Sequence, residues 1–431
     1  MTNKSQINIA VLGLGVIGSG VVHALLGKRA DYEQLVGLPL CLRHVLVQDL
    51  SKERSVDIDN DVLTDNIDDI LNDDSLDIVI EVMGGEDPAY DYISRSLSSG
   101  RYVITANKMV MATHGANLRS IASNNGVDIL YEASVGGGIP VISPLKRDLS
   151  SNRIQGITAI INGTTNYILT KMQEDGVAFD LALSEAQELG YAESDPSLDI
   201  DGHDAVYKIA ILASLAFHTD ISPDQVHCEG IEGISQRDFQ HASELGYVIK
   251  LLASARMKDG SLQVRVHPAL LSKDKQLAKV NGVLNAVQVE ADLVGEVVFQ
   301  GAGAGSLPTT SAVIADVIDA SKMILRGSST QSSDYSADIS LQPIVDLVSR
   351  YYIRMEVTDR PGVFAEIARC FGDGNVSIAS AIQQEVNPNV HTAEIVIMTH
   401  PAIERDVKSS ISHVESLDVV AEIGSFLRVE F

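Results

Sequence analysis

The stretch that decides the fold lies near the N-terminus, where Ile7-Asn8-Ile9-Ala10-Val11-Leu12 leads directly into Gly13-Leu14-Gly15-Val16-Ile17-Gly18. The first six residues form a short apolar run of the kind that predicts a buried strand, and a helical pattern follows the glycines. Gly13 permits a tight turn, Gly15 lets a ligand approach the backbone, and Gly18 allows close packing of helix on strand. A strand, a glycine turn and a helix N-terminus together are the setting of a phosphate-binding loop.

Alternating strands and helices continue from this loop. Further strands are predicted at Val45 to Gln48, Asp77 to Met83, Arg101 to Thr105 and Val127 to Tyr131, with helices at about Asp87–Ser99 and Met109–Asn124. Such alternation predicts a parallel sheet covered by helices on both faces. We therefore expect a dinucleotide-binding domain over residues 1–133, whose cofactor contacts include Gly13, Gly15, Val16, Ile17 and Gly18.

The choice of cofactor depends on residues that follow the second predicted strand. Asp49 stands at its end, where a carboxylate accepts a hydrogen bond from a ribose hydroxyl and disfavours a 2′-phosphate. Lys52 and Arg54 lie just beyond and could attract that phosphate instead. The sequence therefore predicts NADP or NAD and does not choose between them.

Thr105-Ala106-Asn107-Lys108 follows another predicted strand, at the sheet edge where ligands bind in open α/β folds. Lys108 is compatible with a surface lysine at a helix start. The helix dipole makes that position electrostatically poor for a cation, however, and this favours a functional role for Lys108.

Three consecutive glycines lie within Glu132-Ala133-Ser134-Val135-Gly136-Gly137-Gly138-Ile139-Pro140. Glycines at such density let backbone groups face a ligand or a hard cation. The alternative is a flexible connector between domains, which the composition by itself favours.

A strongly apolar helix is predicted from His203 to Phe217, and the spacing of Asp201, Asp204 and Lys208 places them on one helical face. The same face continues as Ile211, Leu212 and Leu215, so it turns inward. A surface Asp204–Lys208 pair would be worth only about 0.3–0.5 kcal/mol. A lysine at the edge of a buried face, held charged by carboxylates, is instead a candidate proton donor.

Composition limits the class of protein. The chain has 431 residues and a net charge of −26, which disfavours binding to nucleic acid or to anionic membranes. It has no apolar run long enough for a membrane span and no signal peptide, so we expect a cytoplasmic protein. The three cysteines have no metal-ligand spacing, and their surroundings do not suit an activated thiol.

The rest of the chain predicts two further domains and a linker. A β-branched run at Ile154–Ile161, several helices, and strands near Leu262–His267 and Ala286–Val298 form a domain over residues 134–300. A glycine-rich segment and a helix over residues 301–326 complete the first domain. A Ser-rich linker at 327–349 precedes a strand, helix, two strands, helix and strand at 350–431.

In this order and spacing the motifs resemble homoserine dehydrogenases that carry a C-terminal ACT domain, and the resemblance spans essentially the whole chain. The motifs are the first glycine loop, Thr105 to Lys108, Glu132 to Pro140, Asn162-Gly163-Thr164-Thr165-Asn166, Glu193 to Lys208, Gly301 to Gly305, and Asp359-Arg360-Pro361-Gly362-Val363. The resemblance implies an α/β chain with an N-terminal Rossmann-type dinucleotide-binding domain, an α+β catalytic and dimerisation domain, and a C-terminal ferredoxin-like ACT domain.

The resemblance also implies roles for individual residues. Lys208 matches the acid–base lysine, and Lys108 the second active-site lysine. Glu193 matches the carboxylate that binds the substrate amino group, supported by Asp199 and by Asp204, which also belongs to the catalytic set. Backbone carbonyls of Glu132, Val135, Gly137 and Ile139 match the ligands of a monovalent cation, sodium or potassium, and Gly303 matches a cofactor contact. The family often has arginine where this chain has Gln48, which weakens an inference of strict NADP preference.

The implied activity is the interconversion of L-homoserine and L-aspartate 4-semialdehyde in threonine, methionine and isoleucine biosynthesis. The implied effector is threonine, which would inhibit through the C-terminal domain, although that domain could instead only promote oligomerisation. The implied assembly is a homodimer or a dimer of dimers, with an interface between about Leu262 and Val298. The alternative from another class is a non-catalytic amino-acid and nucleotide sensor.

Overall fold

The N-terminal sheet of the computed structural model is parallel and has the strand order β3-β2-β1-β4-β5-β6. Strand β1 pairs with β2 on one side and with β4 on the other, so the strand order reverses at β1 and a crevice opens beyond the carboxyl ends of β1 and β4. The strands are β1 Ile7–Leu12, β2 Leu40–Leu46, β3 Leu63–Thr64, β4 Ile78–Glu81, β5 Tyr102–Thr105 and β6 Ile129–Leu130.

The structure describes residues 4–430 except 55, 328–334, 336–338 and 388–391. The predicted Ser-rich stretch at Ser328–Ser333 therefore lies outside the described residues. The chain divides into two compact units, the first formed by residues 1–157, 207–224 and 285–338, and the second by 158–206, 225–284 and 339–431. No helix within the described ranges is long and apolar enough to cross a membrane.

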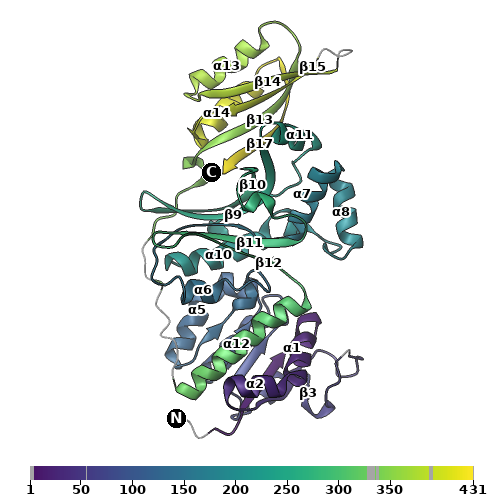
Figure 1. The fold of residues 1–431 in the computed structure, drawn as a ribbon, viewed down its shortest axis with the longest axis vertical. Coiled ribbons are helices and arrows are strands. Elements are labelled where there is room, and N and C mark those ends of the chain that lie inside the picture. Colours follow the sequence, from purple (N-terminus) through teal and green to yellow (C-terminus); the bar gives the residue numbers. More distant parts are fainter. Residues whose placement is uncertain (1–3, 55, 328–334, 336–338, 388–391, 431) are drawn as a thin grey trace. The chain divides into compact units, whose positions relative to one another are not determined.

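Helix α12 (Ser306–Arg326) returns to the first unit and packs beside α1 (Val16–Gly27) and α2 (Arg29–Val36), as Figure 1 shows. The approach of α12 to α1 depends on Gly20, because a Cβ there would lie 2.4 Å from Thr310 Oγ1. The other helices of this unit are α3 Ile67–Leu71, α4 Ala89–Ser98, α5 Lys108–Asn124 and α6 Ile142–Lys146, and its hairpin strands are β11 Leu284–Ala291 and β12 Gly295–Ala302.

In the second unit, the C-terminal region shares a sheet with a hairpin from the middle of the chain. The strand order is β9-β10-β17-β13-β15-β14, and β17 runs parallel to β10. Helices α13 (Val363–Asp373) and α14 (Glu404–Glu415) pack on one face of this sheet, around a core that includes Tyr351 and Phe371. The strands are β8 His227–Cys228, β9 Tyr247–Lys258, β10 Ser261–Ser272, β13 Val348–Thr358, β14 Ile378–Asn387, β15 Thr392–Thr399, β16 Ala402–Ile403 and β17 Val420–Glu430.

The helices of the second unit are α7 Gly163–Asp175, α8 Phe179–Glu188, α9 Ser197–Ile200, α11 Gln236–Glu244, α13 Val363–Asp373 and α14 Glu404–Glu415. Strand β7 (Ile154–Ile160) and helix α10 (His203–Phe217) each cross a point where the chain passes from one unit to the other. The bounds of α10 are those that the sequence predicted.

Several predicted strands differ from the observed ones. Strand β9 was not predicted, because most of it is buried on both faces, and its first half, with Lys250 among apolar residues, lacks the alternation that marks a half-buried strand. The single run predicted at Ala286–Val298 is two strands, β11 and β12, which a turn separates before Gly295 at φ +75°. Strand β2 begins at Leu40 instead of Val45 and ends at Leu46, so Asp49 lies in the loop beyond the strand.

A buried ion cluster joins β17 to the rest of the second unit. Arg428 is 1% exposed and donates from Nε to Glu404 Oε2 at 2.7 Å and from Nη1 to Glu229 Oε2 at 2.6 Å. Burial opposes the ionisation of Glu229, but hydrogen bonds from His227 and Arg428 hold its pKa well below the ordinary value. Both carboxylates are therefore charged and share the Arg428 guanidinium, while Lys408 also pairs with Glu404 and His227 with Glu229.

We predict that Arg428→Met destabilises the second unit by about 3–5 kcal/mol, because removing one partner leaves buried charges uncompensated. The control is Arg405→Met, since Arg405 is exposed and pairs with the half-buried Asp346. That substitution should change the free energy of unfolding by less than about 1 kcal/mol. Urea denaturation of both variants measures the difference, and equal midpoints would contradict the prediction.

Candidate functional site

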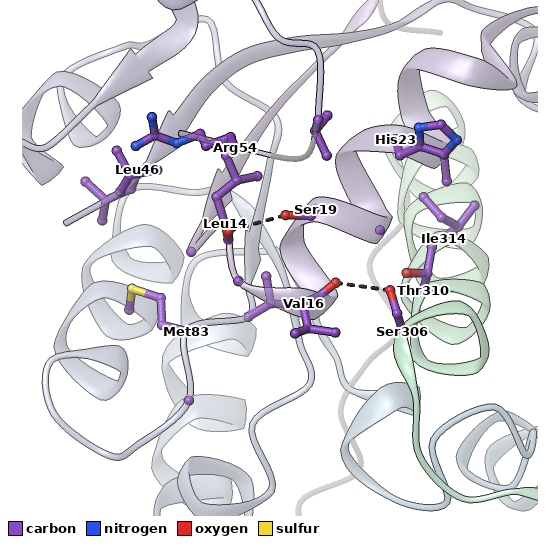
Figure 2. Close-up of a pocket in the computed structure, with 18 of the residues that line it drawn as sticks. Leu14, Val16, Ser19, His23, Leu46, Arg54, Met83, Ser306, Thr310 and Ile314 are labelled. Carbon is purple, nitrogen blue, oxygen red and sulfur yellow. Dashed lines mark hydrogen bonds between the residues drawn. The ribbon is translucent and has the colours of Figure 1, made fainter. Parts of the chain in front are cut away.

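A cleft of about 2080 Å³ opens in the first unit where β1 and β4 end. Figure 2 shows α1 and α12 side by side along it, with Met83 and Arg54 on the opposite wall. The cleft is lined mainly by the glycine loop with α1, the loop after β2, the end of β4 with the start of α4, and the N-terminal half of α12. The residues include Gly13, Gly15, Val16, Ser19, Gln48, Asp49, Lys52, Arg54, Met83, Ser306 and Thr310.

The glycine loop has the geometry of a phosphate-binding turn. Gly13 adopts φ +97°, and a Cβ on Gly18 would lie only 2.0 Å from the Gly13 carbonyl oxygen. By contrast, a Cβ on Gly15 would meet nothing within 4 Å, so its backbone borders open space. Helix α1 begins at the next residue, with its N–H groups and positive dipole end at the cleft. The loop therefore fits a cofactor pyrophosphate.

A second helix N-terminus meets the same cleft, and its residues were not among the predicted site residues. Ser306 Oγ donates to the Val16 carbonyl oxygen at 3.1 Å, a contact drawn in Figure 2, and Thr310 lies one turn further along α12. The available signal was Gly305-Ser306, a glycine directly before the start of a predicted helix.

Two predicted cofactor residues, Thr105 and Gly303, are not among the residues that line the cleft. Thr105 is fully buried, and its hydroxyl donates to Glu81 Oε2 at 2.6 Å and accepts from the Asn107 backbone N–H at 2.9 Å. Burial raises the pKa of Glu81. Gly303 packs against the Asn285 side-chain amide, which a Cβ would meet at 2.0 Å. The contacts described for both residues are therefore with the protein itself.

Two other predicted residues belong to helix starts. Ile17 and Lys108 are absent from the lining, and both are half-buried. Lys108 is the first residue of α5, where the Asn107 side chain accepts from the Val110 backbone N–H at 3.2 Å as the N-cap. Lys108 therefore starts a capped helix at the carboxyl end of β5, as the sequence predicted.

The segment Glu132–Ile139 is a buried, tightly held loop and not a flexible connector. The Glu132 carboxylate accepts from the backbone N–H groups of Val141, Ile142 and Ser143 at 2.6–2.8 Å, and the Glu132 N–H donates to Asp316 at 2.9 Å. Burial raises the pKa of Asp316 to about 8. Val135 and Ile139 are buried, and a Cβ on Gly137 would lie 2.4 Å from the Gly303 carbonyl oxygen.

In the second unit, Asn162 brings two of the predicted carboxylates together. Its Nδ2 donates to Asp199 Oδ1 at 2.6 Å and to Asp204 Oδ2 at 2.9 Å. Its Oδ1 accepts from the Thr165 backbone N–H at 2.8 Å, so the same side chain caps α7. Two adjacent carboxylates form an environment suited to an ammonium group. Asn162 was noted only as part of a motif, and its N-cap position was the signal of this role.

Asn166, in the same motif, has a structural role. Its Nδ2 donates to the backbone carbonyls of Val280, Gly282 and Leu284, while the buried Lys250 donates to its Oδ1 at 3.1 Å. Burial lowers the pKa of Lys250 to about 8. Asn166 therefore anchors the loop before β11 to α7.

The remaining predicted residues have different settings. Glu193 is exposed in the loop after α8, and among the described hydrogen bonds its side chain does not join the Asn162 group. Asp201 is also exposed and precedes α10, so the predicted helical face begins only at Asp204. Lys208 is half-buried on α10, and Ile211, Leu212 and Leu215 of that face are buried.

Cys228 does not have the setting of a nucleophile. Burial raises the pKa of its thiol to about 11, with further contributions from Asp201 and Glu229. A thiol becomes reactive when its pKa is lowered, so the surroundings of Cys228 do not suit an activated thiol, as the sequence predicted.

Comparisons with known proteins agree on one family. The model of the homoserine dehydrogenase NAD-binding domain matches residues 13–132, that of homoserine dehydrogenase matches 140–318, and that of the ACT domain matches 351–418. A homoserine dehydrogenase from Synechocystis sp. is 43% identical, with 98% of this chain and 99% of the relative covered.

Solved structures give the same result. A homoserine dehydrogenase from Thiobacillus denitrificans has a TM-score of 0.93 and 37% identity, with 99% of this chain and 98% of that chain covered. A hyperthermophilic archaeal homoserine dehydrogenase in complex with NADPH has a TM-score of 0.62 and 28% identity, with 73% of this chain and 97% of that chain covered.

Two neighbouring glycines offer a paired test of the loop. We predict that Gly18→Ala destabilises the first unit, because the added methyl would overlap the Gly13 carbonyl. Gly15→Ala should leave the melting temperature unchanged, since open space surrounds that position, yet weaken cofactor binding about tenfold or more by blocking the pyrophosphate. Thermal denaturation and NADH or NADPH titration separate the two effects. A Gly15→Ala variant with unaltered affinity would contradict the assignment of the loop.

Proposed function

Because this chain belongs to the homoserine dehydrogenase family, and is thus an NAD(P)-dependent oxidoreductase, we propose which of its residues bind the substrate and move the proton. The reaction interconverts L-homoserine and L-aspartate 4-semialdehyde. When bound, the nicotinamide accepts or supplies the hydride. The protein must bind an amino acid, hold the reacting carbon at the cofactor, and exchange a proton with the oxygen.

The substrate proposal rests on the Asn162 group, in which the Asn162 side chain holds the carboxylates of Asp199 and Asp204. Asp199 and Asp204 are held by the two hydrogens of one amide, and an ammonium group beside them would be attracted to both charges. Glu193, exposed in the preceding loop, is free to add a third carboxylate when substrate binds. These three residues are our proposed substrate-binding set, together with Lys108.

Lys208 is our proposed acid–base residue. It follows Asp204 by one turn of α10, on a face that continues into buried apolar residues. In the reductive direction the alkoxide formed from the aldehyde needs a proton, and a lysine ammonium can donate it. In the oxidative direction the same amine accepts the proton of the hydroxyl. Lys108, at the start of α5, is the second lysine of this set.

We also propose that the carbonyls of Glu132, Val135, Gly137 and Ile139 hold a sodium or potassium ion. The support is the rigidity of this loop, which is buried and fixed at both ends by the Glu132 and Asp316 hydrogen bonds. Carbonyl oxygens in a fixed loop suit a hard cation. Assembly as a homodimer or a dimer of dimers, and a cytoplasmic location, remain predictions from the sequence.

Inhibition by threonine is the proposed role of the C-terminal domain. The support is a buried polar cluster that ties its sheet to α11: Glu394 accepts from His241 Nε2 at 2.7 Å and from Arg354 Nη1 at 3.3 Å. Arg354 also donates to Asp238 Oδ1 at 2.7 Å. Since α11 packs against α7, whose N-cap is Asn162, a shift of the ACT sheet has a short path to the substrate carboxylates.

We predict that Lys208→Ala lowers turnover of homoserine at least about a hundredfold and leaves cofactor affinity nearly unchanged, because acid–base groups contribute about 10²–10⁴-fold to rate. The control is Lys275→Ala, an exposed lysine in a loop of the second unit. A Lys208→Ala enzyme that keeps more than about a tenth of wild-type turnover would contradict the proposal. A wild-type protein that turns over no homoserine with either cofactor would favour the sensor.

We predict that threonine inhibits the full chain and that Glu394→Gln raises the half-inhibiting concentration about tenfold or more, because the substitution removes the charge between α11 and the ACT sheet. The control is Glu366→Gln, which alters an exposed pair with Arg360 on α13. The full chain is preferable to a truncated chain ending near Ser349, since truncation would also remove β17 from β10. Uninhibited wild-type enzyme would refute the choice of effector.

A further inference from the structure

The loop that follows β2 carries two groups with opposite preferences for a cofactor ribose. Gln48, Asp49, Lys52, Glu53 and Arg54 all line the cleft beside the glycine loop. A carboxylate there accepts hydrogen bonds from the ribose hydroxyls, whereas a free guanidinium would bind a 2′-phosphate. The hydrogen bonds of the loop decide which group is available to the ligand.

Asp49 is held as a charged acceptor. Its Oδ1 accepts from the Ser51 backbone N–H at 2.8 Å and from Ser51 Oγ at 2.6 Å. These two hydrogen bonds lower the pKa of Asp49, with smaller contributions from Arg54 and Lys52. Because both bonds end on Oδ1, the other oxygen can accept from a ribose hydroxyl without loss of the loop structure.

The Arg54 side chain donates hydrogen bonds to backbone carbonyls of its own loop. Its Nη1 donates to the carbonyl oxygens of Leu50, at 3.2 Å, and Lys52, at 2.7 Å, and its Nη2 donates to the Asp49 carbonyl. Three of the five N–H donors, including both on Nη1, are thus used, so the edge formed by Nη1 and Nη2 cannot bind a phosphate without breaking the loop. Arg54 is half-buried, consistent with such a bracing role.

The other charges in the loop do not favour a phosphate. Lys52 is exposed and adjoins Glu53, which is also exposed, so the two charges offset each other. Gln48 is neutral. A 2′-phosphate with nearly two negative charges would meet the Asp49 carboxylate. Because the other charges of the loop offset each other, the net electrostatic effect on the phosphate is repulsive.

We propose that this enzyme prefers NAD over NADP, with Asp49 as the specificity-determining residue and Arg54 as a brace that positions its loop. The proposal rests on the proposed function only in taking the cleft as the cofactor site. The sequence alone leaves open whether Asp49 binds a ribose hydroxyl or Arg54 binds a 2′-phosphate. In this proposal Asp49 recognises the ribose, and Arg54 contributes to the fold of the loop and not to recognition of a phosphate.

The test measures kcat/KM for homoserine oxidation with NAD and with NADP, using the full chain. We expect NAD to be favoured by about tenfold or more. Asp49→Ser should lower the efficiency with NAD, raise that with NADP, and shift their ratio about tenfold or more toward NADP. Arg54→Gln should lower both efficiencies alike and leave the ratio unchanged, because the loop loses its brace. Lys275→Gln, which alters an exposed lysine outside the cleft lining, is the control for a change of surface charge and should leave both efficiencies unchanged.

Titration of NADH and NADPH by nicotinamide fluorescence gives a second readout that does not require turnover. Tighter binding of NADH in the absence of turnover would support the cofactor preference and refute the proposed activity. Turnover with a preference for NADP would overturn the inference and leave the activity intact. A selective loss of NADP efficiency in Arg54→Gln would also overturn it, because a brace would affect both cofactors.

Discussion

The close backbone contact between Gly18 and the Gly13 carbonyl is the constraint on which the first unit depends. It brings the amino end of α1 against β1, and this aims a helix N-terminus at the crevice where the strand order reverses. The absence of a side chain also permits close contacts at Gly20, where α12 approaches α1, and at Gly137, which faces Gly303. Each of these glycines permits a contact that a single methyl group would prevent.

The second unit is organised by buried charge as well as by its apolar core. Arg428 compensates Glu404 and Glu229, and Arg354 compensates Asp238 and Glu394. Burying such groups is costly unless every charge is paired, so these clusters specify one arrangement of the strands more strongly than they stabilise it. They tie the ACT region to Glu229 and Asp238, which precede β9, while β17 pairs directly with β10.

Several motif residues combine a structural and a chemical task. The Asn162 side chain caps α7 with its oxygen and holds two carboxylates with its nitrogen. Glu132 caps the short α6 with its carboxylate, while its backbone remains part of the Glu132–Ile139 loop. Because one side chain fixes both the helix and the site, the local fold sets the geometry of the groups that meet a ligand.

The sequence by itself determined the elements with strong local signals: the glycine turn after β1, the alternating strands and helices, the bounds of α10, and the strand and helix order after Val348. It also identified the family through the order of its motifs. Periodicity and turn residues act over a few positions, so they can be read without knowledge of the rest of the chain.

Only the tertiary structure decided the contacts between distant segments. It assigned Arg54 to backbone carbonyls, turned Thr105 inward toward Glu81, joined Asp199 to Asp204 through Asn162, and paired β17 with β10. It also showed β9, which is buried on both faces along most of its length and has no alternation of apolar and polar residues in its first half. These features depend on which groups burial brings together, and a hydrogen bond across many residues leaves no periodic trace in the sequence.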